Sequence, residues 1–93
     1  MIASFRDKET ERLWRTGKSH RIPADLQRRA FKKLAILNAA VALENLRVPP
    51  GNDLEALRGN RSGQYSIRIN DQYRVCFVWR EGNAFDVEVV DYH

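Results

Sequence analysis

The spacing of apolar residues changes once along the chain, close to residue 50. Before that point they recur at steps of three and four, the spacing of one helix face, at Leu26, Ala30, Leu34, Leu37 and Val41. After residue 60 apolar and polar residues alternate over 65–69, 73–79 and 85–90, as in half-buried strands. The pattern predicts an α+β domain in which two N-terminal helices pack on a small, mainly antiparallel sheet.

Capping residues indicate where the two helices begin and end. Asp7 suits the N-cap of a first helix over residues 8–15, and Gly17 suits its C-terminal end. Pro23 suits the first position of the second helix, because the N–H that proline lacks has no helical partner there. The apolar run 2–5 predicts a further short strand. Ninety-three residues are too few for a second core, so we expect a single domain over residues 1–93.

The turn between the first two long strands decides which residues lie opposite each other. A three-residue turn at 70–72 pairs Ile67 with Val75 and keeps the apolar residues of both strands on one face. The same register places Arg68 opposite Arg74, which is unfavourable for two like charges. Two interpretations stay open at this point: both side chains extend into solvent, or they bind a phosphate group between them.

The charge balance favours an anionic partner. The formal net charge is +4, and twelve arginines stand against four lysines. The planar guanidinium offers a fork of donors that suits phosphate. The exposed side of the second helix is also basic, either as a solvated surface or as a contact with RNA or an acidic protein segment, and it comprises Arg28, Arg29, Lys32 and Lys33.

Cysteine, histidine and hydropathy narrow the class of protein further. Cys76 is the single cysteine and lies within an apolar run, so we expect a buried, inert thiol and no intramolecular disulfide. One cysteine and two histidines give no zinc spacing, and we expect no metal or other cofactor. The chain carries no signal-peptide pattern and no apolar stretch of membrane-spanning length. These features predict a cytoplasmic protein with no membrane partner.

Residues 54–93 contain the groups that cleavage of RNA without a metal requires. Such cleavage needs a base for the 2′-hydroxyl, a cation for the charged phosphorane and an acid for the departing 5′-oxygen. Glu55, a run of arginines that includes Arg74, and the terminal His93 can supply these three functions. Tyr65 and Tyr92 can stack on an unpaired base. Taken singly, each signal also fits a plain alternative, such as exposed charges on a strand or a frayed C-terminal tail.

Several short motifs occur in a characteristic order. They read LEALRG at 54–59, GQYSIRI at 63–69, YRVCF at 73–77 and VDYH at 90–93. With these motifs the chain resembles the RelE toxin superfamily, and within it the HigB branch, whose members also begin Met-Ile-x-Ser-Phe and end Asp-Tyr-His. The resemblance covers nearly the whole chain. It implies a toxin of a type II toxin–antitoxin system that cuts mRNA on the ribosome.

The resemblance also implies roles for individual residues and a protein partner. Arg74 matches the family's phosphate-stabilising arginine, and Tyr92 with His93 matches its terminal aromatic–histidine pair. Glu55 departs from many HigB members, which have histidine there, and agrees with the YoeB branch, which uses glutamate as the base. The residues expected to bind RNA are Arg58, Arg61, Arg68 and Asp91. The implied partners are the ribosome, mRNA and a HigA-like helix-turn-helix antitoxin, through which alone we expect oligomers to form.

Two other functions compete with this interpretation. A toxin of the ParE type has the same fold and acts by binding DNA gyrase, without a nuclease site. A non-catalytic RNA-binding module would also be small and basic. Neither needs to bring Glu55, Arg74 and His93 together.

Overall fold

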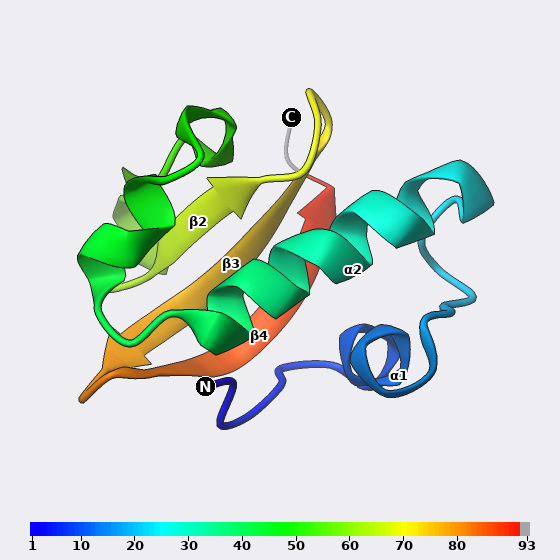
Figure 1. Cartoon of the computed structure of the whole chain (residues 1–93), viewed down its shortest axis with the longest axis horizontal. Coiled ribbons are helices and arrows are strands. Elements are labelled where there is room, and N and C mark those ends of the chain that lie inside the picture. Colours follow the sequence, from blue (N-terminus) through cyan, green and yellow to red (C-terminus); the bar gives the residue numbers. More distant parts are fainter. Residues whose placement is uncertain (92–93) are drawn as a thin grey trace.

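The computed structural model describes residues 1–91 and consists of two helices followed by a four-stranded antiparallel sheet (Figure 1). The helices are α1 (Lys8–Thr16) and α2 (Ala24–Ala39). The strands lie in the order of the sequence and are β1 (Glu55–Ala56), β2 (Tyr65–Arg68), β3 (Tyr73–Arg80) and β4 (Asn83–Asp91). Two 3-10 turns, η1 (Leu43–Arg47) and η2 (Pro50–Asn52), connect the helices to the sheet, and a third, η3 (Gly59–Arg61), lies between β1 and β2. The predicted α+β fold is confirmed.

The predicted caps of the first helix are confirmed, whereas those of the second need correction. Asp7 Oδ2 accepts a hydrogen bond from the Thr10 N–H at 3.0 Å, and Gly17 ends α1 with φ 79°. Pro23 is the N-cap of α2 and not its first helical residue. Helix α2 ends at Ala39 because the backbone becomes extended at residue 40. Val41 therefore lies beyond the helix and is 79% exposed, so its assignment to the buried helix face was wrong.

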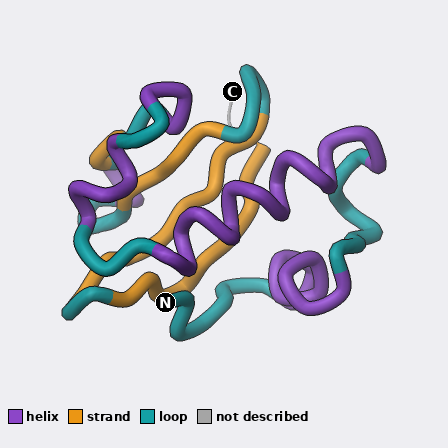
Figure 2. Tube along the Cα trace, viewed as in Figure 1, coloured by secondary structure: helices purple, strands orange, loops and turns teal. Residues whose placement is uncertain are grey.

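Helix α2 lies across one face of the sheet, as the tube view also shows (Figure 2). Its buried residues Ala30, Leu34 and Leu37 belong to the same apolar cluster as Ile67 and Val75 of the strands. Full burial of one such aliphatic side chain stabilises a fold by roughly 1.5–3 kcal/mol. Ile67 and Val75 therefore face the helices. Because side chains alternate along a strand, their neighbours in β2 and β3 lie on the opposite face of the sheet. No helix within residues 1–91 is long and apolar enough to cross a bilayer.

The predicted register between β2 and β3 is confirmed, since Ile67 pairs with Val75 and Arg68 with Arg74. The N-terminal segment lies along the free edge of β4 through two isolated parallel bridges, Ile2 to Ala84 and Phe5 to Val87. The sequence predicted a strand there. The segment covers the β4 edge, which would otherwise offer unpaired backbone groups to other chains.

The sheet face opposite the helices carries a buried thiol and an ion-pair network. Cys76 is fully buried on β3, as predicted. Burial raises the pKa of its thiol, which stays protonated and unreactive as a result. Glu88 of β4 pairs with Cys76 and accepts a hydrogen bond from Arg61 at 3.1 Å. An arginine from the segment before β2 is thus paired with an acidic residue of β4.

Candidate active site

Arg74 is the most deeply buried charged group of the sheet, with 6% of the residue exposed. It lies on the face opposite the helices, and its guanidinium is surrounded by acceptors. Nε donates to Ser66 Oγ at 3.1 Å, and Nη2 donates to the backbone oxygen of Asp53 at 2.7 Å. The same Nη2 lies 3.2 Å from Asp53 Oδ2 and 3.4 Å from Glu55 Oε1. The Ser66 hydroxyl and the Asp53 carbonyl therefore hold this cation in place, and two carboxylates lie beside it.

The two arginines that face each other across the ladder are each neutralised from within the chain. Arg68 forms an ion pair with Asp71 in the turn, while Arg74 pairs with Asp53 and Glu55. Neither interpretation from the sequence, solvent exposure of both heads or a phosphate between them, anticipated carboxylate partners. The like-charge repulsion expected from the register is relieved locally, because each arginine has its own acid.

A pocket of about 240 Å³ opens at these ion pairs. It is lined by Asp53, Glu55, Arg68, Asn70, Asp71 and Arg74. The side chains of Asp53 and Glu55 are 59% and 50% exposed, in contrast to 8% for Arg74. Carboxylates this exposed can move aside at little cost, so an incoming phosphate oxygen can take their position on the guanidinium. The pocket joins a carboxylate that can accept a proton to cations that can stabilise an anionic phosphorus centre.

Asp53 is part of this site although the sequence analysis did not identify it. It contacts Arg74 through both its carbonyl and its carboxylate, and its φ of 46° is in the left-handed region that few non-glycine residues adopt. Residues in strained backbone conformations cluster at functional sites. The signal in the sequence was an Asn-Asp pair after Pro-Pro-Gly, which is typical of a turn and gives no direction to the side chain.

The remaining residues predicted to bind RNA do not line this pocket. Arg58 is exposed and borders a shallow depression that begins at Glu55. Arg61 is held by Gln64 and Glu88, at 3.1 Å from each. Tyr65 is partly buried, stacks on Phe77 with 6.3 Å between ring centroids and packs against the apolar core, and its stacking on a base stays a prediction.

Strand β4 brings the C-terminal part of the chain beside the arginine pocket. Val90 pairs with Arg74, and Asp91 pairs with Tyr73 and accepts a hydrogen bond from Gln72 Nε2 at 3.1 Å. Asp91 is the last residue described. Tyr92 and His93, the predicted terminal pair, lie outside the described residues.

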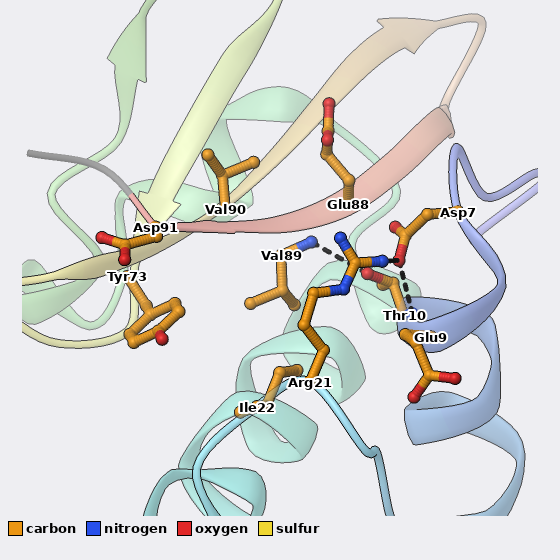
Figure 3. A pocket seen from close by; sticks show the side chains of 10 residues that line it. All are labelled: Asp7, Glu9, Thr10, Arg21, Ile22, Tyr73, Glu88, Val89, Val90 and Asp91. Carbon is orange, nitrogen blue, oxygen red and sulfur yellow. Dashed lines mark hydrogen bonds and ion pairs between the residues drawn. The ribbon is translucent and has the colours of Figure 1, made fainter.

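A second pocket, of about 280 Å³, lies between α1, the loop before α2 and the end of β4 (Figure 3). Two of its hydrogen bonds join the elements that form it. Arg21 reaches across it to Asp7 Oδ2 at 2.6 Å, and the Val89 N–H donates to Thr10 Oγ1 at 3.0 Å. The bond between Thr10 and Val89 joins α1 to β4.

Two N-terminal helices packed on one face of an antiparallel sheet, with an arginine–carboxylate pocket on the other, are consistent with the RelE-like class of small toxin. The chain belongs to this class: residues 3–93 match the family described as the RelE-like toxin of type II toxin–antitoxin system HigB. Toxins of such systems have an antitoxin partner, so this chain has one too.

Curated relatives agree with the family. The chain is 46% identical over 87 residues to Toxin HigB-1 of Vibrio cholerae, and the match covers 92% of each chain. It is 36% identical over 90 residues to an uncharacterized protein of Haemophilus influenzae, covering 96% of this chain and 88% of that one. It is 29% identical to the protein named Endoribonuclease HigB of Proteus vulgaris over 93 residues, the full length of both.

Proposed function

We propose that this toxin is a ribosome-dependent endoribonuclease that cleaves mRNA by metal-independent acid–base chemistry. The observation that carries the proposal is the contact between Glu55 Oε1 and Arg74 Nη2, 3.4 Å apart in a pocket that Arg68 also lines. A proton acceptor beside a fixed cation is the pairing that attack by a 2′-hydroxyl on phosphorus requires. The similarity to a protein named as an endoribonuclease supports the same reaction class.

Each catalytic side chain has one role in the proposed reaction. Glu55 accepts the proton of the 2′-hydroxyl while its oxygen attacks phosphorus. Arg74, with Arg68 beside it, stabilises the charge that collects on the phosphorane oxygens. His93 donates a proton to the 5′-oxygen as the P–O5′ bond breaks, and Tyr92 positions the reacting nucleotide. Arg58, Arg61 and Asp91 contact RNA around the pocket.

The partners follow from the same proposal. The substrate is mRNA on the ribosome, so the toxin acts in the cytoplasm. The basic character of the chain, with a net charge of +4, favours approach to ribosomal RNA. We propose that the antitoxin is a HigA-like helix-turn-helix protein and that oligomers form only through the complex with it.

Expression of the toxin without its antitoxin is expected to arrest growth and to cut translated messages. Primer extension on a message should give new 5′ ends inside its coding region. The same message with its ribosome-binding site deleted should stay intact, because the cleavage requires the ribosome. Growth arrest with intact messages and inhibited gyrase would contradict the proposal and favour the ParE-type function.

A further inference from the structure

One lysine of α2 differs from its basic neighbours. Arg28, Arg29 and Lys32 are exposed, whereas Lys33 is half-buried and its Nζ donates a hydrogen bond to Asn52 Oδ1 at 2.6 Å. The sequence analysis placed Lys33 on the same solvated or RNA-binding surface as the other three, which was wrong. Burial lowers the pKa of Lys33, and Arg29 and Arg68 add to the effect. The hydrogen bond to Asn52 Oδ1 offsets part of this cost for the charged lysine and holds its side chain in one place.

Asn52 joins that lysine to the turn before β1. It is fully buried, and its Nδ2 donates to the backbone oxygens of Leu46 at 3.1 Å and Val48 at 3.2 Å. All the polar groups of its side chain are thus engaged, with Lys33 as the partner of Oδ1. The side chain fixes η2 against both α2 and the segment that leads into it.

The next residue of the same turn holds the candidate catalytic arginine. Asp53 accepts hydrogen bonds from Arg74 Nη2 through its carbonyl at 2.7 Å and through Oδ2 at 3.2 Å. Its φ of 46° directs these two acceptors to the sheet face opposite the helices. Two successive residues therefore connect the two layers: Asn52 binds Lys33 of the helix, and Asp53 binds Arg74 of the sheet.

We propose that Lys33 and Asn52 are positioning residues for the cleavage reaction: through the strained turn at Asp53 they set the place of the Arg74 guanidinium. This inference rests on the proposed function. Neither residue lines the pocket, so neither needs to touch RNA. Displacement of a catalytic group by about 1 Å can lower a rate 10²-fold. A loop fixed on only one side would allow a shift of this size.

Lys33→Met is expected to lower kcat for cleavage of mRNA on programmed ribosomes by roughly 10-fold while leaving KM near the wild-type value. Methionine keeps the unbranched shape and the helix propensity of lysine, is one heavy atom shorter, and removes the charge and the hydrogen bond. Lys32→Met is the matched control, because it removes the same charge from the preceding residue of α2, which is exposed. A loss of RNA attraction would raise KM in both variants. A loss of positioning lowers kcat in Lys33→Met alone.

A second readout follows Arg74 without any RNA. The Nε–H of Arg74 is buried and bonded to Ser66 Oγ at 3.1 Å, so its NMR signal should exchange slowly with water. The Nε–H signal of Arg74 is identified as the one that is lost in Arg74→Lys. In Lys33→Met the Arg74 signal should shift and exchange at least several-fold faster, whereas Lys32→Met should match the wild type.

The two readouts separate the outcomes. An unchanged Arg74 signal in a folded Lys33→Met protein overturns the inference, whatever happens to kcat. If Lys33→Met does not fold, both measurements pass to Lys33→Gln, whose shorter side chain cannot reach Asn52 without moving the turn. A Lys33→Gln protein with the wild-type kcat and the wild-type Arg74 signal would also overturn the inference. If the wild-type toxin cuts no mRNA, the proposed function fails, and the NMR comparison alone decides whether Lys33 positions Arg74.

Discussion

Replacing Arg74 with lysine is expected to lower single-turnover cleavage of ribosome-bound mRNA by about 10²-fold, equivalent to roughly 3 kcal/mol of lost transition-state stabilisation. Lysine keeps the charge but not the planar fork, which here contacts Ser66, Asp53 and Glu55 at the same time. Lysine is the better test than alanine, because alanine would leave a cavity and two carboxylates without their cation. The rate is measured by rapid quench with excess toxin.

The control for that loss is Arg80→Lys on the same strand. Arg80 is exposed and stacks its guanidinium over Phe85, 4.3 Å from the ring centroid and away from the pocket. We expect near-normal cleavage by Arg80→Lys and a melting temperature within a few degrees of the wild type for both variants. A folded Arg74→Lys protein with wild-type cleavage would remove Arg74 from the mechanism.

Deletion of His93 is expected to lower single-turnover cleavage by roughly 10²-fold or more, the usual scale for loss of a general acid. An imidazole titrates near neutral pH and is therefore suited to donate a proton to the 5′-oxygen. A tag fused after His93 should impair cleavage too, whereas a tag fused before Met1, which is 66% exposed, should leave it intact.

His20→Gln serves as the matched control for His93→Gln. His20 is the other histidine of the chain and is exposed in the loop between α1 and α2. Loss of cleavage in His93→Gln with normal cleavage in His20→Gln would support the general acid. Full activity without His93 would contradict that role and direct attention to Tyr92 and Glu55.

The register between β2 and β3 was predictable because the apolar residues of both strands must lie on the same face of the sheet. A shift of one residue between β2 and β3 would move every apolar side chain to the wrong face, so Ile67 must pair with Val75 and Arg68 with Arg74. The end of α2 and the two-residue strand β1 were not predictable in this way. Neither depends on a repeating pattern: the helix stops where a single residue, Ala40, becomes extended, and β1 exists only through its pairing with β2.

The arginines of the candidate site were predictable from the sequence, whereas the acidic residues that pair with them were predictable only in part. The register and motifs singled out Arg68 and Arg74, and Glu55 lies beside Arg74 as its proposed role requires. Asp53 was not identified, and Lys33 was grouped with the exposed basic residues of α2, because the contacts of both depend on how a turn at 50–53 folds against the helix. That arrangement is set by tertiary hydrogen bonds through a buried asparagine, which no local spacing encodes.

The central claim, attack by the 2′-hydroxyl without a metal, is tested most directly by the chemistry of the cut ends. Purified toxin is added to ribosomes programmed with an mRNA that carries either ribose or 2′-deoxyribose at the nucleotide 5′ of the cleaved bond. With ribose, we expect a 2′,3′-cyclic phosphate on one fragment and a 5′-hydroxyl on the other, because the 2′-oxygen forms the new bond to phosphorus and the 5′-oxygen departs with a proton. With 2′-deoxyribose, cleavage should stop at that bond. Fragments with a 5′-phosphate, or unchanged cutting of the deoxy substrate, would contradict the mechanism, because water would then be the nucleophile.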